Sequence, residues 1–528
     1  MYSFMLAALM FPTRMVHSGV GLDQYPDSYL DSVAASGMSA VILYVDEPPD
    51  IARTGRVDVN DLVRRARARG LDVYAYAHLK REHLPKLHPL DPGAREVYDA
   101  AYGTIVKNAP GLKGLICVGE SAAFPSRDPG MGGFWWQHEK GAAHTNGFWP
   151  ASDWVDWLNL VGDVTRKYRP DFEIIFWTYN WFHAPEANRL ALLERISTNV
   201  TLHVTYEMEP GIDDYSIVRS GPGSVFRSEA ALAKRRRIRL TSMTNTGGRT
   251  WDFGGIPFVP VPRHWLARFR ALRATHREFG LAGLMESHHY GFTPNFISDL
   301  AAVAFSTATS DADLDRALDT LAARDFGADN IAAVKAAWDE WDAAMDLHPT
   351  RYADQWGELR IGPAYPLVKI GEKLPVPPCR TSWKYVEPVF RYSRDQLAPS
   401  IDRARREVAH WQAGCDRLEA LLPSVPAERR DAARKILGVG RYCERTMRTL
   451  LNHRLYCREM LAEKPDAGNV RAILRDETEN VKATIPLVTA DPRLGWEPSM
   501  RFVASPEILE WKLKLTNDLS QRLGVSAN

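Results

Sequence analysis

The feature that most constrains the fold of this chain is a repeated alternation of short apolar runs with amphipathic stretches between residues 4 and 285. Each run has the length and composition of a buried strand, and the stretches between them have the apolar spacing of helices. The eight runs are residues 4–10, 40–45, 71–77, 114–119, 172–177, 200–206, 238–243 and 281–285. Eight such units fit a closed (β/α)8 barrel in length and rhythm. A doubly wound open sheet is the alternative, but it usually carries a glycine-rich first turn, which this sequence lacks.

The sequence after the eighth run has a different character. Residues 311–346 keep helical periodicity, residues 347–392 are irregular and rich in Pro and Gly, and residues 393–463 have the pattern of long amphipathic helices. The prediction is therefore an α/β chain that begins with a TIM barrel and ends in helices. Its parts are a catalytic (β/α)8 barrel over 1–310, a helical extension and irregular connection over 311–392, and an α-helical C-terminal domain over 393–528.

The overall composition is that of an ordinary globular protein. The chain has 66 Lys and Arg against 65 Asp and Glu, so its charge favours neither nucleic acid nor a membrane surface as a partner. No apolar run in the sequence is long enough to span a bilayer. Five cysteines without a CxxC pair predict neither a disulfide framework nor a zinc site, so we expect a reduced, cytoplasmic location. The apolar start of the chain has the pattern of a first strand rather than of a signal peptide.

Nearly every predicted strand ends in polar, charged or aromatic residues, as expected where eight loops share one active face. The fourth run, Gly114-Leu-Ile-Cys-Val-Gly119, leads directly to a single carboxylate, Glu120. A lone acid in this position, beneath aromatic side chains, is how a sugar-cleaving barrel presents its proton donor. A loop-start Glu that is merely solvated is the other interpretation. The loop that follows is rich in aromatic residues: Phe134, Trp135, Trp136, Phe148 and Trp149.

Cleavage of a glycosidic bond also needs a second carboxylate, as a nucleophile or as the base that activates water. Glu286 follows the eighth run directly, whereas Glu207 and Glu209 follow the sixth and share the parity that places both on one side. The seventh run leads to Asn245 and has no acid before Asp252. We therefore expect Glu286 or Glu207 to be the second carboxylate, with Glu209 behind them.

The remaining polar and aromatic residues near the strand ends are candidates for substrate binding. Flat rings stack on the apolar faces of sugars, and the expected platforms are Trp135, Trp136, Trp177, Trp181 and Trp251. The expected ligands for hydroxyl groups or a carboxylate are Arg14, His78, Lys80, Asn180, Asn245, His288 and His289. Adjacent histidines rarely ligate one metal together, and the sequence has no HxH or HExxH motif. Acid–base chemistry is therefore favoured over a metal, and we expect no cofactor.

Two features of the C-terminal part bear on partners. Residues 491–498, which include Arg493, Trp496 and Glu497, break the helical pattern. We interpret this segment first as a turn between helices and second as a loop that reaches over a barrel mouth. The helical C-terminal domain is the part through which we expect any homodimer to form.

The segment Gly114-Leu-Ile-Cys-Val-Gly-Glu120-Ser resembles the strand-four segment that carries the general acid in barrel glycoside hydrolases of the α-glucuronidase family. Trp177-Thr-Tyr-Asn180 and residues 200–206 follow in a similar order and spacing, and residues 298–305 resemble the segment after the barrel in that family. The likeness covers residues 1–345, and a looser one extends to β-N-acetylhexosaminidase-type barrels. It implies a TIM barrel with Glu120 as the general acid.

The sequence departs from these families in places that matter for the substrate. The α-glucuronidases have base carboxylates after strands six and seven, but here strand seven leads to Asn245. No uronate-binding set is identifiable, and the Asp that hexosaminidases place before the acid is Gly119. We expect no counterpart here to the domain that precedes the barrel in the α-glucuronidase family. We predict a glycoside hydrolase with carboxylate acid/base chemistry, acting from the end of an oligosaccharide or glycoside. The alternatives are a barrel that binds carbohydrate without cleaving it and a metal-dependent barrel hydrolase or isomerase.

Overall fold

The structure of the protein is a computed structural model. It describes residues 10–17, 25–45, 57–77, 79–120, 124–132, 140–145, 147–210, 220–250, 253, 255–288, 291–348, 358–377, 394–497 and 501–525. The chain forms two compact units. The first comprises Met1–Asp213, Gly221–Asn245 and Arg270–Gly291, and the second comprises Asp214–Ser220, Thr246–Phe269 and Phe292–Asn528.

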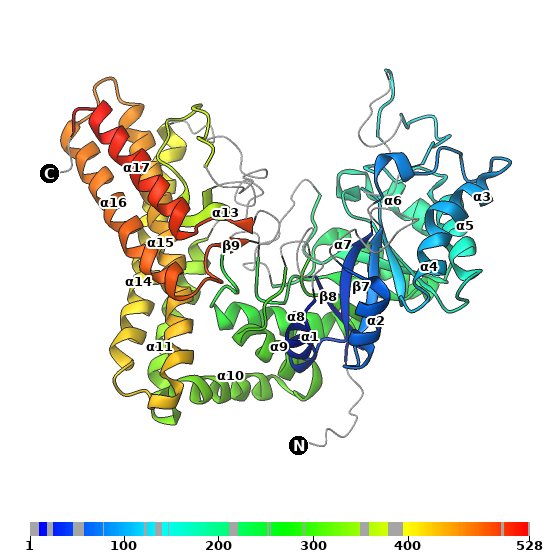
Figure 1. The fold of residues 1–528 in the computed structure, drawn as a ribbon, viewed down its shortest axis with the longest axis horizontal. Helices are drawn as coiled ribbons and strands as arrows, with labels where there is room; N and C mark the ends of the chain where they lie inside the picture. The colour runs from blue at the N-terminus through cyan, green and yellow to red at the C-terminus, as the bar shows by residue number, and fades with distance from the viewer. Residues whose placement is uncertain are drawn as a thin grey trace. The chain divides into compact units, whose positions relative to one another are not determined.

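The first unit is built on a closed barrel of eight parallel strands in the order β1 to β8, which confirms the predicted fold class (Figure 1). Each strand pairs with the next along the chain, and β1 pairs with β8 to close the barrel. The strands are β1 (Thr13–His17), β2 (Ala40–Val45), β3 (Asp72–Ala77), β4 (Gly114–Val118), β5 (Glu173–Trp177), β6 (Val200–Thr205), β7 (Leu240–Met243) and β8 (Leu281–Met285).

The position of the first strand differs from the prediction. We expected it at residues 4–10, with Arg14 and His17 beyond its end, but β1 is Thr13–His17 and contains both residues. Residues 4–9 lie outside the described part of the chain. The pairing of Met15 with Ala40 on one side and with Met285 on the other sets the register of β1. These partners come from distant parts of the sequence, so the apolar run alone does not reveal the register.

Helices connect the strands of this unit much as the apolar spacing predicts. They are α1 (Asp27–Ala35), α2 (Val59–Arg67), α3 (Ala94–Tyr98), α4 (Thr104–Asn108), α5 (Trp154–Arg166), α6 (Glu186–Leu193), α7 (Ser224–Arg236) and α8 (Pro262–Phe279), with shorter turns η1 (Arg81–His83), η2 (Asp99–Gly103) and η3 (Trp181–His183). Helix α5 buries Trp154 against the outside of the barrel, where its ring lies 5.5 Å from that of Phe176 on β5. Burial of such large rings supplies much of the stability of the layer between helices and strands.

A polar network occupies the barrel at the amino ends of its strands. Tyr74 donates a hydrogen bond to Glu173 (3.0 Å), and Arg239 donates to the same carboxylate (3.0 Å) and to the hydroxyl of Thr13 (2.6 Å). These residues come from β1, β3, β5 and the position just before β7, so their side chains identify the positions that point into the barrel. Because side chains alternate along a strand, Tyr76, Trp177, Thr241 and His17 point inward as well.

The second unit is helical. Its elements are α9 (Phe296–Ser306), α10 (Asp311–Phe326), η4 (Ala328–Asn330), α11 (Ile331–Leu347), α13 (Glu358–Ile361), η5 (Gly362–Ala364), α14 (Arg394–Leu421), η6 (Ala427–Arg429), α15 (Arg430–Met460), α16 (Ala467–Ala490), β9 (Trp496–Glu497), β10 (Arg501–Phe502) and α17 (Pro506–Arg522). Helices α14 to α17 lie side by side, each next to the one that follows it in sequence (Figure 1).

Glycines allow three helices of this unit to pack closely around one tryptophan. Trp341 on α11 is fully buried. A Cβ atom at Gly414 on α14 would lie 2.6 Å from its Nε1, and one at Gly440 on α15 would lie 2.7 Å from its Cε2. Close approach of this kind is available only to glycine. The helices are therefore fixed by shape complementarity at Trp341.

Two further properties concern the described residues as a whole. Four cysteines, Cys117, Cys415, Cys443 and Cys457, are buried free thiols. None of the described helices combines the length and the hydropathy of a transmembrane span.

Candidate active site

Glu120 lies just beyond the carboxyl end of β4. The N–H of Gly119 donates to the carbonyl of Trp177 (3.2 Å), so the chain follows the barrel up to the residue before Glu120. The side chain of Glu120 is half-buried. Burial raises the pKa of Glu120 to about 7, and a hydrogen bond from the Asn180 side chain partly opposes that rise. A carboxyl group with such a pKa can hold a proton near neutral pH, as a general acid requires.

Asn180 reaches Glu120 because the backbone turns sharply at this residue. Its φ of 67° and ψ of −4° lie in the left-handed region, which asparagine tolerates better than most residues. The turn is closed by a hydrogen bond from the N–H of Trp181 to the carbonyl of Thr178 (3.1 Å). The structure thus brings together two residues that the sequence predicts for the site, one from the end of β4 and one from the end of β5.

Trp177 lies inside the barrel and joins several strands. Its indole N–H donates to the hydroxyl of Thr205 on β6 (3.1 Å). Its ring meets the edge of His203 at 5.1 Å between centroids and that of His288, after β8, at 4.8 Å. The side chain of Trp177 is fully buried. It therefore closes the barrel beneath the mouth instead of standing at the mouth as an exposed platform.

A chain of rings continues from Trp177 around the inside of the barrel. His288 lies 5.8 Å from Tyr76 on β3, Tyr76 lies 4.7 Å from Tyr44 on β2, and Tyr44 lies 4.8 Å from His17 on β1. All four side chains are buried. Together with Trp177 they form what we call the ring floor: His17, Tyr44, Tyr76, Trp177 and His288.

Glu207 follows β6 and is completely buried. On that strand His203 and Thr205 point into the barrel, where both contact Trp177. Glu207 continues the same alternation one step closer to the carboxyl end. Extended past the end of β6 at Thr205, this alternation assigns the carboxylate to the barrel side, in the same unit as Glu120.

Asn245, after β7, is buried in an unusual state. Its φ of 52° is left-handed, and its side-chain oxygen and nitrogen make no hydrogen bond to any part of the chain that the structure describes. Asn245 lies four residues after Thr241, an even spacing along the chain. The hydroxyl of Thr241 meets the ring of His203 inside the barrel (2.8 Å). Buried polar groups are normally satisfied, so an Asn in this state is suited to a ligand hydroxyl group.

His203 is a further candidate site residue that the sequence alone did not indicate. Burial lowers its pKa to about 3, so the ring is neutral, and its Nε2 makes no hydrogen bond within the described ranges. Tyr44 and Tyr76, of the ring floor, were missed as well. Side-chain alternation along the strands could have indicated them. Each of the three residues occupies a strand position whose side chain points into the barrel, two to four residues before a polar residue at the strand end.

Glu286 and Arg14 form a buried ion pair. Arg14 pairs in register with Leu284, and its guanidinium also donates to the carbonyl of Gly37, in the turn after α1 (3.2 Å). That turn belongs to the helical layer around the barrel, so Arg14 points away from the lumen. Glu286 lies two residues after Leu284, so its side chain is on the same face of the sheet, and it pairs with Arg14 on that outer face. The two predicted site residues are therefore brought together, but on the helix side of the sheet.

Three other predicted residues lie away from the ring floor. Trp181 is fully buried in the outer core, 5.2 Å from Phe176 and 5.8 Å from Trp154, so it offers no exposed face to a sugar. Glu209 is half-buried and accepts a hydrogen bond from Ser224 at the start of α7. Lys80 is exposed before η1. The remaining predicted residues, His78, Trp135, Trp136, Trp251 and His289, lie outside the described part of the chain.

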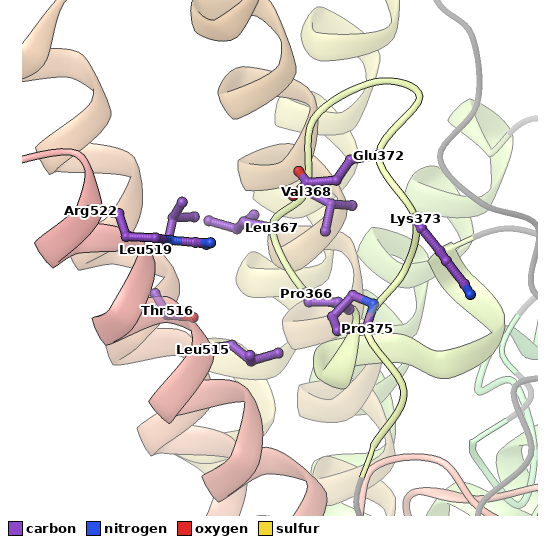
Figure 2. A pocket seen from close by; sticks show the side chains of 10 residues that line it. All are labelled: Pro366, Leu367, Val368, Glu372, Lys373, Pro375, Leu515, Thr516, Leu519 and Arg522. Atoms are coloured by element: carbon purple, nitrogen blue, oxygen red, sulfur yellow. The ribbon is translucent and has the colours of Figure 1, made fainter.

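No three His, Cys, Asp or Glu side chains among the described residues are arranged to hold a metal ion. The helical unit contains a separate cavity of about 170 Å³ between α17 and the segment before residue 376 (Figure 2). Its lining is Pro366, Leu367, Val368, Glu372, Lys373, Pro375, Leu515, Thr516, Leu519 and Arg522. Glu372 is the one carboxylate in that lining, so this cavity does not offer the pair of acids that glycoside cleavage requires.

Comparison with solved structures shows the same fold in two glycoside hydrolases. One is a GH138 enzyme targeting pectin rhamnogalacturonan II, with a TM-score of 0.58 and 10% identity over 98% of this chain and 84% of the other. The second is a family GH115 4-O-methyl-α-glucuronidase with specificity for decorated arabinogalactans, with a TM-score of 0.51 and 11% identity over 97% of this chain and 62% of the other. A scan against protein-family models gives no match, and neither does a search of curated proteins.

These likenesses define the class of fold. The chain is a TIM-barrel protein built like glycoside hydrolases, with helices after the barrel. It spans less than two thirds of the length of the GH115 enzyme. At 10% and 11% identity the likeness shows the fold and not the chemistry.

Proposed function

We propose that the protein is a glycoside hydrolase in which Glu120 is the general acid. The observation that carries the proposal is the setting of Glu120, a half-buried carboxyl group at the carboxyl end of a barrel strand, with a pKa raised to about 7 by burial. Active sites of TIM barrels lie at that end of the strands. A carboxylic acid that is protonated near neutral pH can donate its proton to the oxygen of the leaving group.

We propose Glu207 as the second carboxylate. Its support is complete burial and the alternation of side chains along β6, whereas Glu286 is held by Arg14 on the helix side and Glu209 by Ser224 beside α7. Strands β4 and β6 flank β5, so their ends are separated by roughly 10 Å along the sheet. Long side chains that converge from such ends can reach the separation of about 5 to 9.5 Å over which paired carboxylates act.

The substrate would lie above the ring floor. Asn245 supplies a buried amide for a hydroxyl group, while Asn180 is positioned beside the acid. The ring floor closes the barrel below this space through Trp177 and His288. We propose that a terminal sugar occupies this space, so that the enzyme is exo-acting.

The test is hydrolysis of a panel of 4-nitrophenyl glycosides and natural oligosaccharides by the wild-type chain and by Glu120→Gln. Loss of the general acid should lower kcat by about 10²- to 10⁴-fold on the natural substrate. Glu96→Gln, an exposed acid on α3, is the matched control and should be unaffected. A barrel that only binds carbohydrate would show binding without cleavage, and equal kcat values for Glu120→Gln and the wild type would contradict the assignment.

A further inference from the structure

The loop after β4 returns to Glu120 through a glycine. Gly147 has a φ of +96°, and a Cβ atom there would lie 2.6 Å from the carbonyl oxygen of Gly119 and 3.3 Å from the Cα of Glu120. Only glycine permits this approach. The backbone of the loop at residue 147 therefore rests directly on the backbone that carries the proposed acid.

Two flat side chains flank this contact. The rings of His144 and Trp149 are stacked, with centroids 3.5 Å apart and an angle of 4° between their planes. They stand three residues before and two residues after Gly147. Both are half-buried, so part of the stacked pair faces solvent. This arrangement differs from Trp177 and Trp181, whose rings are fully buried.

The backbone around the pair is fixed at several points. His144 forms a bridge with Met131, in which its N–H donates to the carbonyl of Gly130 (3.0 Å) and its carbonyl accepts from Gly132 (2.8 Å). The carbonyl of Trp149 accepts from the indole of Trp154 on α5 (3.2 Å). A surface whose backbone is already held in place loses little conformational entropy when it binds a ligand.

Hydrogen bonds to Asp128 and Asp153 also fix the segments on either side of the stacked pair. Asp128 accepts from the N–H groups of Gly130 (3.0 Å) and Ser152 (2.9 Å). Asp153 accepts from the hydroxyl of Ser126 (2.9 Å) and meets the imidazole of His88 (3.2 Å). The two acids thus join residues 126–130 to residues 152–153, and Asp153 also contacts His88 in the segment after η1.

We propose that the stacked pair His144 and Trp149 binds the ring of the leaving group, which makes the preferred substrate a glycoside whose leaving group is itself a sugar. This inference rests on the proposed function. A general acid protonates the oxygen between the two sugars, so the leaving group has to lie on the side of Glu120. Indole and imidazole faces stack on the apolar face of a sugar ring. Gly147 holds the backbone between the two rings against the backbone of Gly119 and Glu120.

The experiment compares two substrates that deliver the same sugar: the oligosaccharide cleaved in the panel and the glycosyl fluoride of the sugar released from it. Fluoride has no ring to bind, so only the oligosaccharide depends on the pair. Trp149→Ala should lower kcat/KM for the oligosaccharide by on the order of tenfold and leave the glycosyl fluoride within about twofold. Compared with Trp149→Ala, Trp149→Phe should restore most of the kcat/KM for the oligosaccharide. Trp149→Leu should not restore it, because leucine supplies apolar bulk without a flat ring.

Each outcome has one meaning. Equal losses on both substrates, or no loss on either, would overturn the leaving-group assignment and leave the proposed hydrolase intact. Recovery by Trp149→Leu as complete as by Trp149→Phe would also overturn it, since packing alone would then explain the effect. If the wild-type chain cleaves no glycoside of the panel, the proposed function fails and the inference fails with it. Thermal midpoints of the variants confirm that each is folded.

Discussion

Replacing Glu120 by Gln should change the pH dependence of stability even before a substrate is known. The pKa of Glu120 is raised from 4.5 to about 7 in the folded protein because burial disfavours its charged form. Below pH 4.5 the carboxyl group is protonated in both the folded and the unfolded chain and has no effect on stability. Between pH 4.5 and 7 the unfolded chain ionises first, so the wild-type protein loses stability as the pH rises. Gln does not titrate and escapes this loss.

The size of the effect follows from the two pKa values. One pH unit corresponds to about 1.4 kcal/mol, so the difference between 4.5 and about 7 predicts that up to about 3 kcal/mol is lost above pH 7. For a unit of this size, that free energy corresponds to a shift in Tm on the order of 5 °C. Glu120→Gln should therefore be more stable than the wild type at alkaline pH and similar to it near pH 4.5.

The assay is thermal unfolding of the wild type, Glu120→Gln and the exposed control Glu96→Gln at pH 5 and pH 8.5. The difference in Tm between Glu120→Gln and the wild type should grow by several degrees from the lower to the higher pH. Glu96→Gln should stay close to the wild type at both values, as surface substitutions usually do. A Glu120→Gln difference that is the same at both pH values would refute the raised pKa and remove the main support for the general acid.

Two substitutions outside the site test the packing within each of the two units. Arg189→Leu should lower the free energy of unfolding of the barrel unit by about 3 to 5 kcal/mol, because the carboxylate of Glu229 would stay buried without its cation. Denaturant unfolding should show that the double variant Arg189→Leu, Glu229→Leu recovers part of this loss. No recovery would speak against an ion-pair effect. Gly440→Ala should cost about 1 to 3 kcal/mol through overlap with Trp341. Gly438→Ala, on the same helix, is the control, because its Cβ would meet Leu487 at an ordinary 3.4 Å, and an equal loss in both variants would speak against overlap with Trp341.

The sequence pattern predicts the barrel well because the pattern is local. Strands β2 to β8 and most helices fall where the apolar spacing places them, since each element has to bury its own face. The first strand is the exception: an apolar run suggests residues 4–10, but the register of Thr13–His17 depends on partners in β2 and β8. The position of Glu120 at the end of a strand could be predicted for the same local reason.

The surroundings of the site residues could not be predicted because they depend on distant contacts. Arg14 and Glu286 are 272 positions apart in sequence, and only the barrel's closure shows that they pair on the helix side. Trp181 has the strand-end position of a platform, but Phe176 and Trp154 bury its ring. Parity alone would have identified His203, whereas its neutral state follows from complete burial.

The central claim is that Glu120 donates the proton during glycoside cleavage. The most direct test is the pH dependence of kcat/KM on the natural glycoside, which reports the ionisations of the free enzyme. We predict that activity falls on the alkaline side with an apparent pKa of about 7, and that this fall is absent from the residual activity of Glu120→Gln. An alkaline limb that persists unchanged in Glu120→Gln would contradict the account.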